Sequence, residues 1–335
     1  MITRTEEIRQ TPIWQQSLAS VIRDIDELLA IVKLDASQLN ISEAARKQFS
    51  LRIPRAYVDC IKPGDANDPL LKQILPVNDE MLEFERFNTD PVSDLQSIVA
   101  GGVLQKYQGR ALLLTTGACA IHCRYCFRRH FPYSVENAAQ NDWIAAIDYL
   151  KSHEDISEVI LSGGDPLTLT DNRLVSLVEK IEKISHINTL RLHTRLPVVL
   201  PERVCKELLD WLTNSRLHTV IVIHCNHVQE ISPAVMHALK ILKQAGVTLL
   251  NQSVLLKGVN DSTADLKALS LGLFAAGVLP YYLHMLDPVS GAAHFEVDEN
   301  LAIEMLNQLQ AELPGYLVPR LVREIAAKPS KTYVF

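Results

Sequence analysis

The sequence predicts an α/β fold built from six consecutive strand–helix units. From Arg110 onward, short runs of aliphatic and β-branched residues alternate with longer amphipathic segments. The short runs are apolar along nearly their whole length, as expected of parallel strands buried on both faces. Right-handed crossovers leave two architectures, an open doubly wound sheet or a curved, incomplete form of the eight-unit barrel. No Gly-x-Gly-x-x-Gly pattern follows the first strand, which weakens a dinucleotide-binding interpretation.

Local patterns give the order of the elements. The strands are expected at residues 110–117, 158–164, 188–194, 219–226, 247–254 and 278–286. The helices are expected at residues 138–152, 171–184, 201–214, 232–245, 263–276 and 298–312. The fourth helix has the clearest signals, with Ser232 as N-cap, Pro233 at the first helical position and Gly246 after its end.

The first 100 residues lack this alternation and predict a helical N-terminal appendage. Helical patterns over 19–32 and 42–51 are followed by connections rich in Pro and Asp. We therefore expect three regions: a helical N-terminal region over 1–100, the strand–helix units over 101–316, and a C-terminal segment over 317–335.

Composition excludes several classes of protein. Of the 335 residues, 47% are hydrophobic and 21% charged, which is typical of a globular protein and not of a disordered or fibrous one. The net charge of -6 gives no basic field for nucleic acid. Residues 1–16 have no apolar run typical of a leader, and no stretch approaches the roughly 18 apolar residues of a membrane span. The scattered Cys60, Cys205 and Cys225 make a poor disulfide framework, so a cytoplasmic location with reduced thiols is expected.

Three further cysteines follow the first expected strand with the spacing Cys-x3-Cys-x2-Cys. They are Cys119, Cys123 and Cys126, at the end of the strand where α/β barrels place their chemistry. Structural zinc usually takes four protein ligands, so three local thiolates favour a four-iron cluster with one iron left open. A zinc site completed by His122 or His130, and a chance grouping, are the alternatives.

With Tyr125 before its last cysteine, this motif resembles the signature of the radical S-adenosylmethionine (SAM) enzymes. The resemblance implies a partial (β/α)6 barrel with a [4Fe-4S] cluster, whose open iron binds SAM and whose electron cleaves SAM to a 5′-deoxyadenosyl radical. The residues implied to contact SAM are Ser162, Gly163, Gly164, Asp165 and His224. For the stretch after the second strand, the alternative is an ordinary strand-to-helix turn capped by Asp165 or Thr168.

Matches spread over every unit, such as CRYCFRRHFPY, LRLHTRLPVV and PYYLHMLDPVSGAAHF, resemble the lysine 2,3-aminomutases, most of all their short bacterial members. This resemblance covers about 106–331 and implies pyridoxal phosphate (PLP) on Lys331. Because Ala326 and Ala327 stand where family members usually have glycines, Lys328 is a competitor for this role. The other implied PLP contacts are Lys106, Tyr107, Arg110 and Gln252. Arg128 is implied to bind the substrate carboxylate, and Asp287 and Glu324 to bind its side-chain ammonium.

The implied activity is that of an isomerase that converts L-lysine to β-lysine by a 2,3-amino shift. The short bacterial members are implied to supply (R)-β-lysine to a ligase that modifies elongation factor P, with flavodoxin or ferredoxin as reductant. A stand-alone aminomutase that makes a free β-amino acid is the alternative, and a zinc-stabilised binding module is a third interpretation. Ser262 stands where the long aminomutases have a zinc-binding cysteine, so no zinc is expected. His284 replaces an aromatic hydroxyl near the substrate, and a homo-oligomer is left open.

Overall fold

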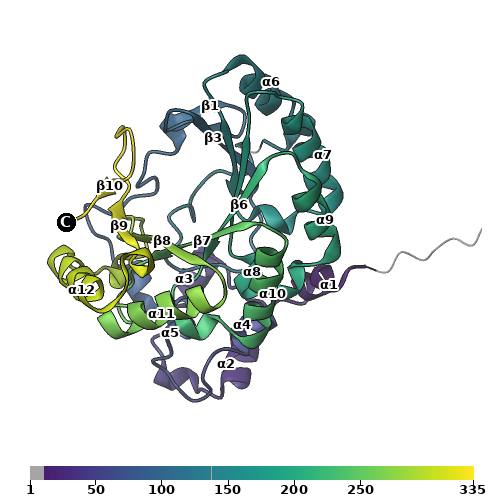
Figure 1. Cartoon of the computed structure of the whole chain (residues 1–335). Coiled ribbons are helices and arrows are strands. Elements are labelled where there is room, and N and C mark those ends of the chain that lie inside the picture. The colour runs from purple at the N-terminus through teal and green to yellow at the C-terminus, as the bar shows by residue number, and fades with distance from the viewer. Residues whose placement is uncertain (1–10, 137) are drawn as a thin grey trace, which may run out of the picture.

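The computed structural model describes residues 11–136 and 138–335. The first ten residues of the expected N-terminal region, and with them most of the segment inspected for a leader, lie outside this description. Ten strands form one sheet in which β1 to β10 follow one another in chain order (Figure 1). Sequential order is that of a singly wound barrel wall, because a doubly wound sheet reverses its strand order.

The six expected strands form a parallel array. They are β3 (Arg110–Thr116), β4 (Glu158–Gly163), β5 (Thr189–Thr194), β6 (His218–His224), β7 (Thr248–Val254) and β8 (Leu279–His284). A seventh parallel strand, β9 (Arg320–Arg323), pairs with β8 and was not predicted. The edges are antiparallel, with β1 (Ile98–Ala100) and β2 (Val103–Leu104) beside β3, and β10 (Thr332–Tyr333) beside β9. Within the described residues β1 and β10 do not pair, so the barrel is open.

Helices cover the outer side of this curved sheet (Figure 1). They are α6 (Ile144–Ser152), α7 (Asp171–Glu182), α8 (Leu196–Val199), α9 (Lys206–Asn214), α10 (Pro233–Gln244), α11 (Thr263–Ala275) and α12 (Glu299–Glu312). Two expected helices start later than predicted. The helix expected from residue 138 begins only at Ile144, because Asp142 and Trp143 have positive φ angles of 54° and 70°. The helix expected from residue 201 begins at Lys206, after a separate turn of 3-10 helix.

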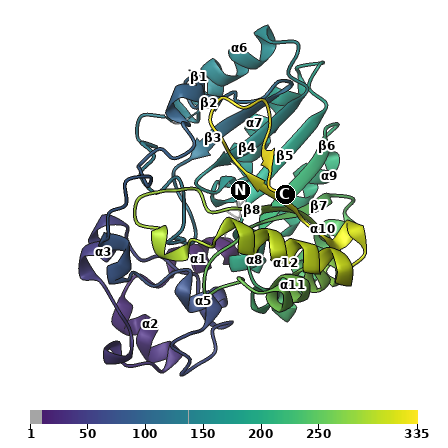
Figure 2. The ribbon, with the colours of Figure 1, turned by 90° about the vertical axis from the view of Figure 1, so that its left-hand side faces the viewer.

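From residue 11 to residue 100, where the structure describes the N-terminal region, the chain forms five short α-helices: α1 (Ile13–Ala19), α2 (Ile25–Val32), α3 (Glu43–Gln48), α4 (Arg55–Val58) and α5 (Pro69–Lys72). The prediction of one helix over 19–32 was wrong, because α1 ends at Ala19 and Asp24 caps α2 by accepting from the backbone N–H groups of Asp26 and Glu27. Helices α2 and α5 lie at the end of the molecule away from α6 (Figure 2).

One hydrophobic core joins the N-terminal helices to the barrel. Leu28 and Leu70 belong to the same buried cluster as Leu161 and Leu192 of the sheet. The expected boundary near residue 100 is therefore not a boundary in packing. None of the helices in the described part of the chain is both long and apolar enough to cross a lipid bilayer.

Candidate active site

A cavity of about 560 Å³ opens at the carboxyl ends of the parallel strands. Every residue that the sequence places in the site lines this cavity except Ser162, whose hydroxyl lies 3.4 Å from Arg128 Nη1. Segments more than 200 residues apart in the chain meet here. The structure therefore brings the predicted cluster, cofactor and substrate residues into one space.

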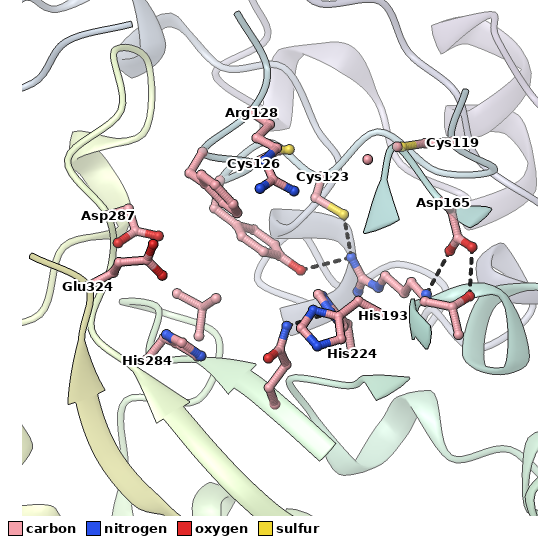
Figure 3. A pocket seen from close by; sticks show the side chains of 18 of the residues that line it. Cys119, Cys123, Cys126, Arg128, Asp165, His193, His224, His284, Asp287 and Glu324 are labelled. Carbon is pink, nitrogen blue, oxygen red and sulfur yellow. Dashed lines mark hydrogen bonds between the residues drawn. The ribbon is translucent and has the colours of Figure 1, made fainter. Parts of the chain in front are cut away.

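The three cysteines lie on the loop that follows β3 (Figure 3). Burial raises the pKa of the Cys126 thiol to about 11 and raises that of Cys119 well above its ordinary value. A thiolate in such a site needs a nearby cation, and ligation to iron provides one. The donor set and its burial therefore fit an iron–sulfur cluster.

The two histidines considered as zinc ligands have protein partners. His122 stacks on Phe49 and its Nδ1 lies 2.7 Å from the carbonyl oxygen of Ser50, while Nε2 of His130 lies 3.3 Å from the carbonyl oxygen of Ser290. In the part of the chain that the structure describes, no three His, Cys, Asp or Glu side chains are placed to hold a single metal ion.

Gly163 and Gly164 lie where the end of β4 passes the cysteine loop. A β-carbon on Gly163 would lie 2.5 Å from the carbonyl oxygen of Thr116, and one on Gly164 would lie 2.3 Å from that of Ala118. Gly163 also has a φ of +119°. The close approach of the protein's own backbone therefore requires both glycines. Both also line the cavity, and their contact with SAM stays a prediction.

Asp165, the next residue, is bonded to the protein at both carboxylate oxygens. Oδ1 accepts from the Leu167 N–H and the Thr194 hydroxyl, and Oδ2 accepts from the backbone N–H groups of Arg195 and Leu196. Burial raises its pKa to about 6, although these bonds oppose the shift. The turn alternative thus describes its observed bonds, and contact with SAM stays a prediction.

His224 at the end of β6 is a neutral imidazole in this cavity. Burial, and then the charges of Arg195, Arg128 and Lys331, lower its pKa to about 3. Its Nε2 lies 2.7 Å from Nε2 of Gln252, the residue expected to contact PLP. The ring of His193 packs edge-on against it at 6.2 Å.

Glu324 links two lysines on the opposite wall. Its Oε1 lies 2.7 Å from Lys106 Nζ and its Oε2 lies 2.8 Å from Lys331 Nζ. Burial alone would raise the pKa of Glu324, but the two ammonium groups outweigh it and lower the pKa to about 2. Lys331 therefore faces the cavity, whereas Lys328, its competitor, is exposed.

Asp287 lies beside Glu324 and points into the same space (Figure 3). Burial, and then the negative charge of Glu324, raise its pKa to about 7. At neutral pH Glu324 is ionised and Asp287 is partly protonated. A cation that binds between the two carboxyl groups would be attracted by Glu324 and would favour the ionised form of Asp287.

Arg128 and Asp94 form a buried ion pair on the wall nearer the cysteines. Arg128 Nε donates to Asp94 Oδ2 at 2.6 Å, and the other oxygen of Asp94 lies 2.6 Å from Lys106 Nζ. Burial disfavours the charged form of Arg128, but Asp94 more than compensates and raises its pKa. Asp94 thus orients two of the predicted site residues.

Arg110 retains an unbalanced positive charge. Its guanidinium packs over the ring of Tyr107 at 4.8 Å and, within the described residues, forms no ion pair. Its Nε is buried without a hydrogen-bond partner. This cation suits an anionic group that enters the cavity.

Sequence reasoning missed several residues that line the cavity, among them Asp94, His193, Arg195 and Tyr282. Arg195 follows directly after an expected strand, and this position could have indicated a site residue. Asp94 lies in an irregular connection, where the sequence has no comparable signal.

The chain is similar to known enzymes over most of its length. The model of the Radical SAM superfamily matches residues 113–269. L-lysine 2,3-aminomutase of Escherichia coli (strain K12) is 46% identical over 320 residues, which cover 95% of this chain and 93% of that protein. The protein of the same name from Haemophilus influenzae is 46% identical, with coverages of 97% and 96%. Glutamate 2,3-aminomutase of Clostridioides difficile is 31% identical, with coverages of 96% and 76%.

The fold and the three-cysteine loop define the class as the radical SAM enzymes. Within it, the chain belongs to the lysine 2,3-aminomutase family and is an isomerase. Membership of this family implies a [4Fe-4S] cluster, SAM and PLP.

Proposed function

We propose that the protein converts L-lysine to β-lysine by moving the amino group from carbon 2 to carbon 3. The observation that carries this proposal is the pair Asp287 and Glu324, buried side by side in the cavity opposite Arg128. An arginine for the substrate carboxylate and two carboxyl groups for a distant ammonium match a lysine. The same pair would repel the side-chain carboxylate of glutamate, the substrate named for one relative.

We assign the cluster to Cys119, Cys123 and Cys126. A cluster held by these cysteines, together with SAM, would supply the radical chemistry of the reaction. Gly163, Gly164, Asp165 and His224 line the adjacent part of the cavity, with Ser162 behind Arg128. A flavodoxin or ferredoxin is the proposed reductant.

We assign the PLP lysine to Lys331, whose amine faces the cavity. PLP, when bound, supplies a conjugated ring that accommodates the unpaired electron while nitrogen migrates. Arg110, a partly buried cation that forms no ion pair in the described part of the chain, suits the phosphate, and Tyr107 packs beside it. Lys106 and Gln252 complete the proposed contacts, although in this structure they bond to Glu324 and His224.

We propose further that the product is (R)-β-lysine destined for a ligase that modifies elongation factor P. Support for this step is the resemblance of the chain to the short bacterial aminomutases. The competing proposal is a free β-amino acid as the final product. A coupled reaction that contains the ligase and elongation factor P distinguishes the two, because only the first predicts transfer of the labelled product to protein.

An anaerobic product assay tests the main proposal. The chain, reconstituted with iron, sulfide, PLP and SAM and reduced with dithionite, is incubated with L-lysine or L-glutamate, and products are separated by chiral chromatography. We expect β-lysine from lysine and no β-glutamate. Equal turnover of both amino acids, or no β-amino acid from either, would contradict the proposal.

A further inference from the structure

A buried guanidinium contacts one of the three cluster cysteines. Arg195, directly after β5, is only 6% exposed. Its Nη1 donates to Cys123 Sγ at 2.7 Å and to the Tyr125 hydroxyl at 2.8 Å. The dashed line that ends on the sulfur of Cys123 in Figure 3 marks the first contact. In the described part of the chain, no other arginine side chain donates a hydrogen bond to a cysteine of this loop.

The rest of the guanidinium is held so that Nη1 remains directed at the sulfur. Its Nη2 donates to Glu230 Oε2 at 2.9 Å and to Gln73 Oε1 at 2.8 Å. Glu230 is itself 1% exposed, and its Oε1 accepts from the backbone N–H groups of Asn226 and His227. The backbone N–H of Arg195 is fixed by Asp165. Both ends of the side chain are therefore positioned before any cluster is bound.

This arrangement has an electrostatic consequence for a cluster ligated by Cys123. Arginine remains charged in protein interiors, and a hydrogen bond from a charged donor is about twice as strong as a neutral one. Reduction adds negative charge to a cluster, so a charged donor at a ligand sulfur stabilises the reduced form. The negative charge of Glu230 offsets only part of the effect of the guanidinium on the cluster, because Glu230 is bonded to Nη2 and not to the Nη1 that contacts the sulfur.

We propose that Arg195 is a positioning residue that raises the reduction potential of the cluster through its hydrogen bond to Cys123, with Glu230 holding the guanidinium in place. The inference rests on the cluster assignment proposed above. Part of the control of the reduction potential would then come from the residue that follows β5, whereas the cysteines lie on the loop that follows β3.

The test uses two variants and a matched control, all reconstituted anaerobically and assayed for iron and sulfide. Arg195→Lys keeps the buried charge but cannot contact both Cys123 and Glu230 with a planar fork. The double variant Arg195→Gln with Glu230→Gln removes the ion pair without changing net charge. The control is the double variant Arg203→Gln with Asp171→Asn. Arg203 is also buried and pairs with Asp171 at 2.8 Å. Its Nη1 lies 3.6 Å from the sulfur of Cys205, which is not one of the three cysteines of the loop.

The readout is a redox titration followed by the electron paramagnetic resonance signal of the reduced cluster. In the double variant we expect the reduction potential of the cluster to be lower. The one-electron equilibrium constant should change at least tenfold, which corresponds to about 59 mV. Arg195→Lys should show a smaller shift, and the control should match the wild-type chain. If Arg195→Lys takes up its cluster and the reduction potential is unchanged, the inference is overturned. This result is decisive even if the double variant binds no iron. A wild-type chain that takes up no cluster overturns the cluster assignment and the inference with it.

Discussion

Asp287 and Glu324 are adjacent carboxyl groups whose pKa values shift in opposite directions. Glu324 contacts two lysines and has a pKa of about 2, whereas Asp287 has a pKa of about 7. Burial acts on both, but only Glu324 has cations within 3 Å. At neutral pH a bound ammonium would therefore gain a second negative charge only when Asp287 releases its proton.

This difference predicts the pH dependence of lysine use. The KM for L-lysine should rise as pH falls below about 7, approaching about tenfold per pH unit, because the Asp287 carboxyl must then lose a proton on binding. Asp287→Asn should raise KM at pH 8 by about tenfold or more and remove the part of the pH dependence that arises from this group. KM is measured from pH 6 to 9, with Asp210→Asn on the exposed face of α9 as control. An Asp287→Asn profile parallel to that of the wild-type chain would contradict the assignment.

The cluster assignment is tested at single cysteines. Cys123→Ala should lose cluster iron, because a site with three thiolates has no spare ligand, while the barrel remains folded. Iron and sulfide content and far-ultraviolet circular dichroism measure the two effects. Cys205→Ala and Cys225→Ala are the controls and should keep their iron. Loss of iron from Cys225→Ala would instead indicate a fourth protein ligand.

Among the elements, the hairpin of β9 and β10 explains how Lys331 reaches the cavity. Thr332 pairs with Arg323 across the antiparallel hairpin, so the preceding Lys331 faces Glu324. Lys331 Nζ accordingly lies 2.8 Å from Glu324 Oε2 and 5.9 Å from the centre of the Tyr282 ring. The turn between the two strands includes Ala327 with a φ of 62°, a conformation that glycine adopts more easily.

The hairpin predicts which lysine carries PLP. Lys331→Ala should abolish borohydride-stable pyridoxyl labelling and aminomutase turnover, while the cluster and reductive cleavage of SAM remain measurable. Lys328→Ala, on the exposed turn, is the matched control and should label as the wild-type chain does. Peptide mass mapping locates the pyridoxyl group. Label on Lys328 with none on Lys331 would reverse the assignment, and no labelled lysine would contradict the PLP proposal.

At the scale of the whole molecule, the N-terminal region holds the cysteine loop of the barrel in place through hydrogen bonds and ion pairs. Arg124, between two of the cysteines, is fully buried and its Nε and Nη2 donate to the Glu80 carboxylate at 2.8 and 2.6 Å. Arg129 donates to the same carboxylate at 2.8 Å. The backbone N–H of Arg124 also donates to the carbonyl oxygen of Gln73. The N-terminal region is therefore part of the structure that holds the cysteine loop in place.

Removal of this link should affect both stability and the cluster. Glu80→Gln leaves two buried guanidinium groups without a counter-charge, and we expect a loss of about 3 to 5 kcal/mol in the free energy of unfolding together with lower iron content. Glu43→Gln breaks the exposed pair with Arg46 and should leave the free energy of unfolding almost unchanged, because water screens this pair. Urea denaturation and iron analysis measure both. Equal stability and iron content in the two variants would show that the loop is held independently of Glu80.

The sequence by itself determined the six parallel strands β3 to β8 and the cysteine loop at the end of the first of them, whereas periodicity left their order in the sheet open between two architectures. These features depend on apolar periodicity and on motif spacing within a few residues, which the chain carries locally. Its failures were also informative. Of the single helix expected over 19–32, only the part from Ile25 onward is helical, because α1 ends at Ala19 and Asp24 caps the start of α2. Strand β9 has only four residues and is too short to be recognised by its pattern.

Only the tertiary structure decided which charges meet. Asp94 acquires Arg128 and Lys106 as partners, and Arg195 acquires Cys123, across 12 to 72 positions of sequence. Such pairs depend on where the barrel brings distant loops together, and in a single sequence an aspartate in an irregular connection looks the same whether it is buried or solvated. Burial in a shared cavity then sets their pKa values and hydrogen bonds, because the missing water makes each remaining charge depend on its neighbours.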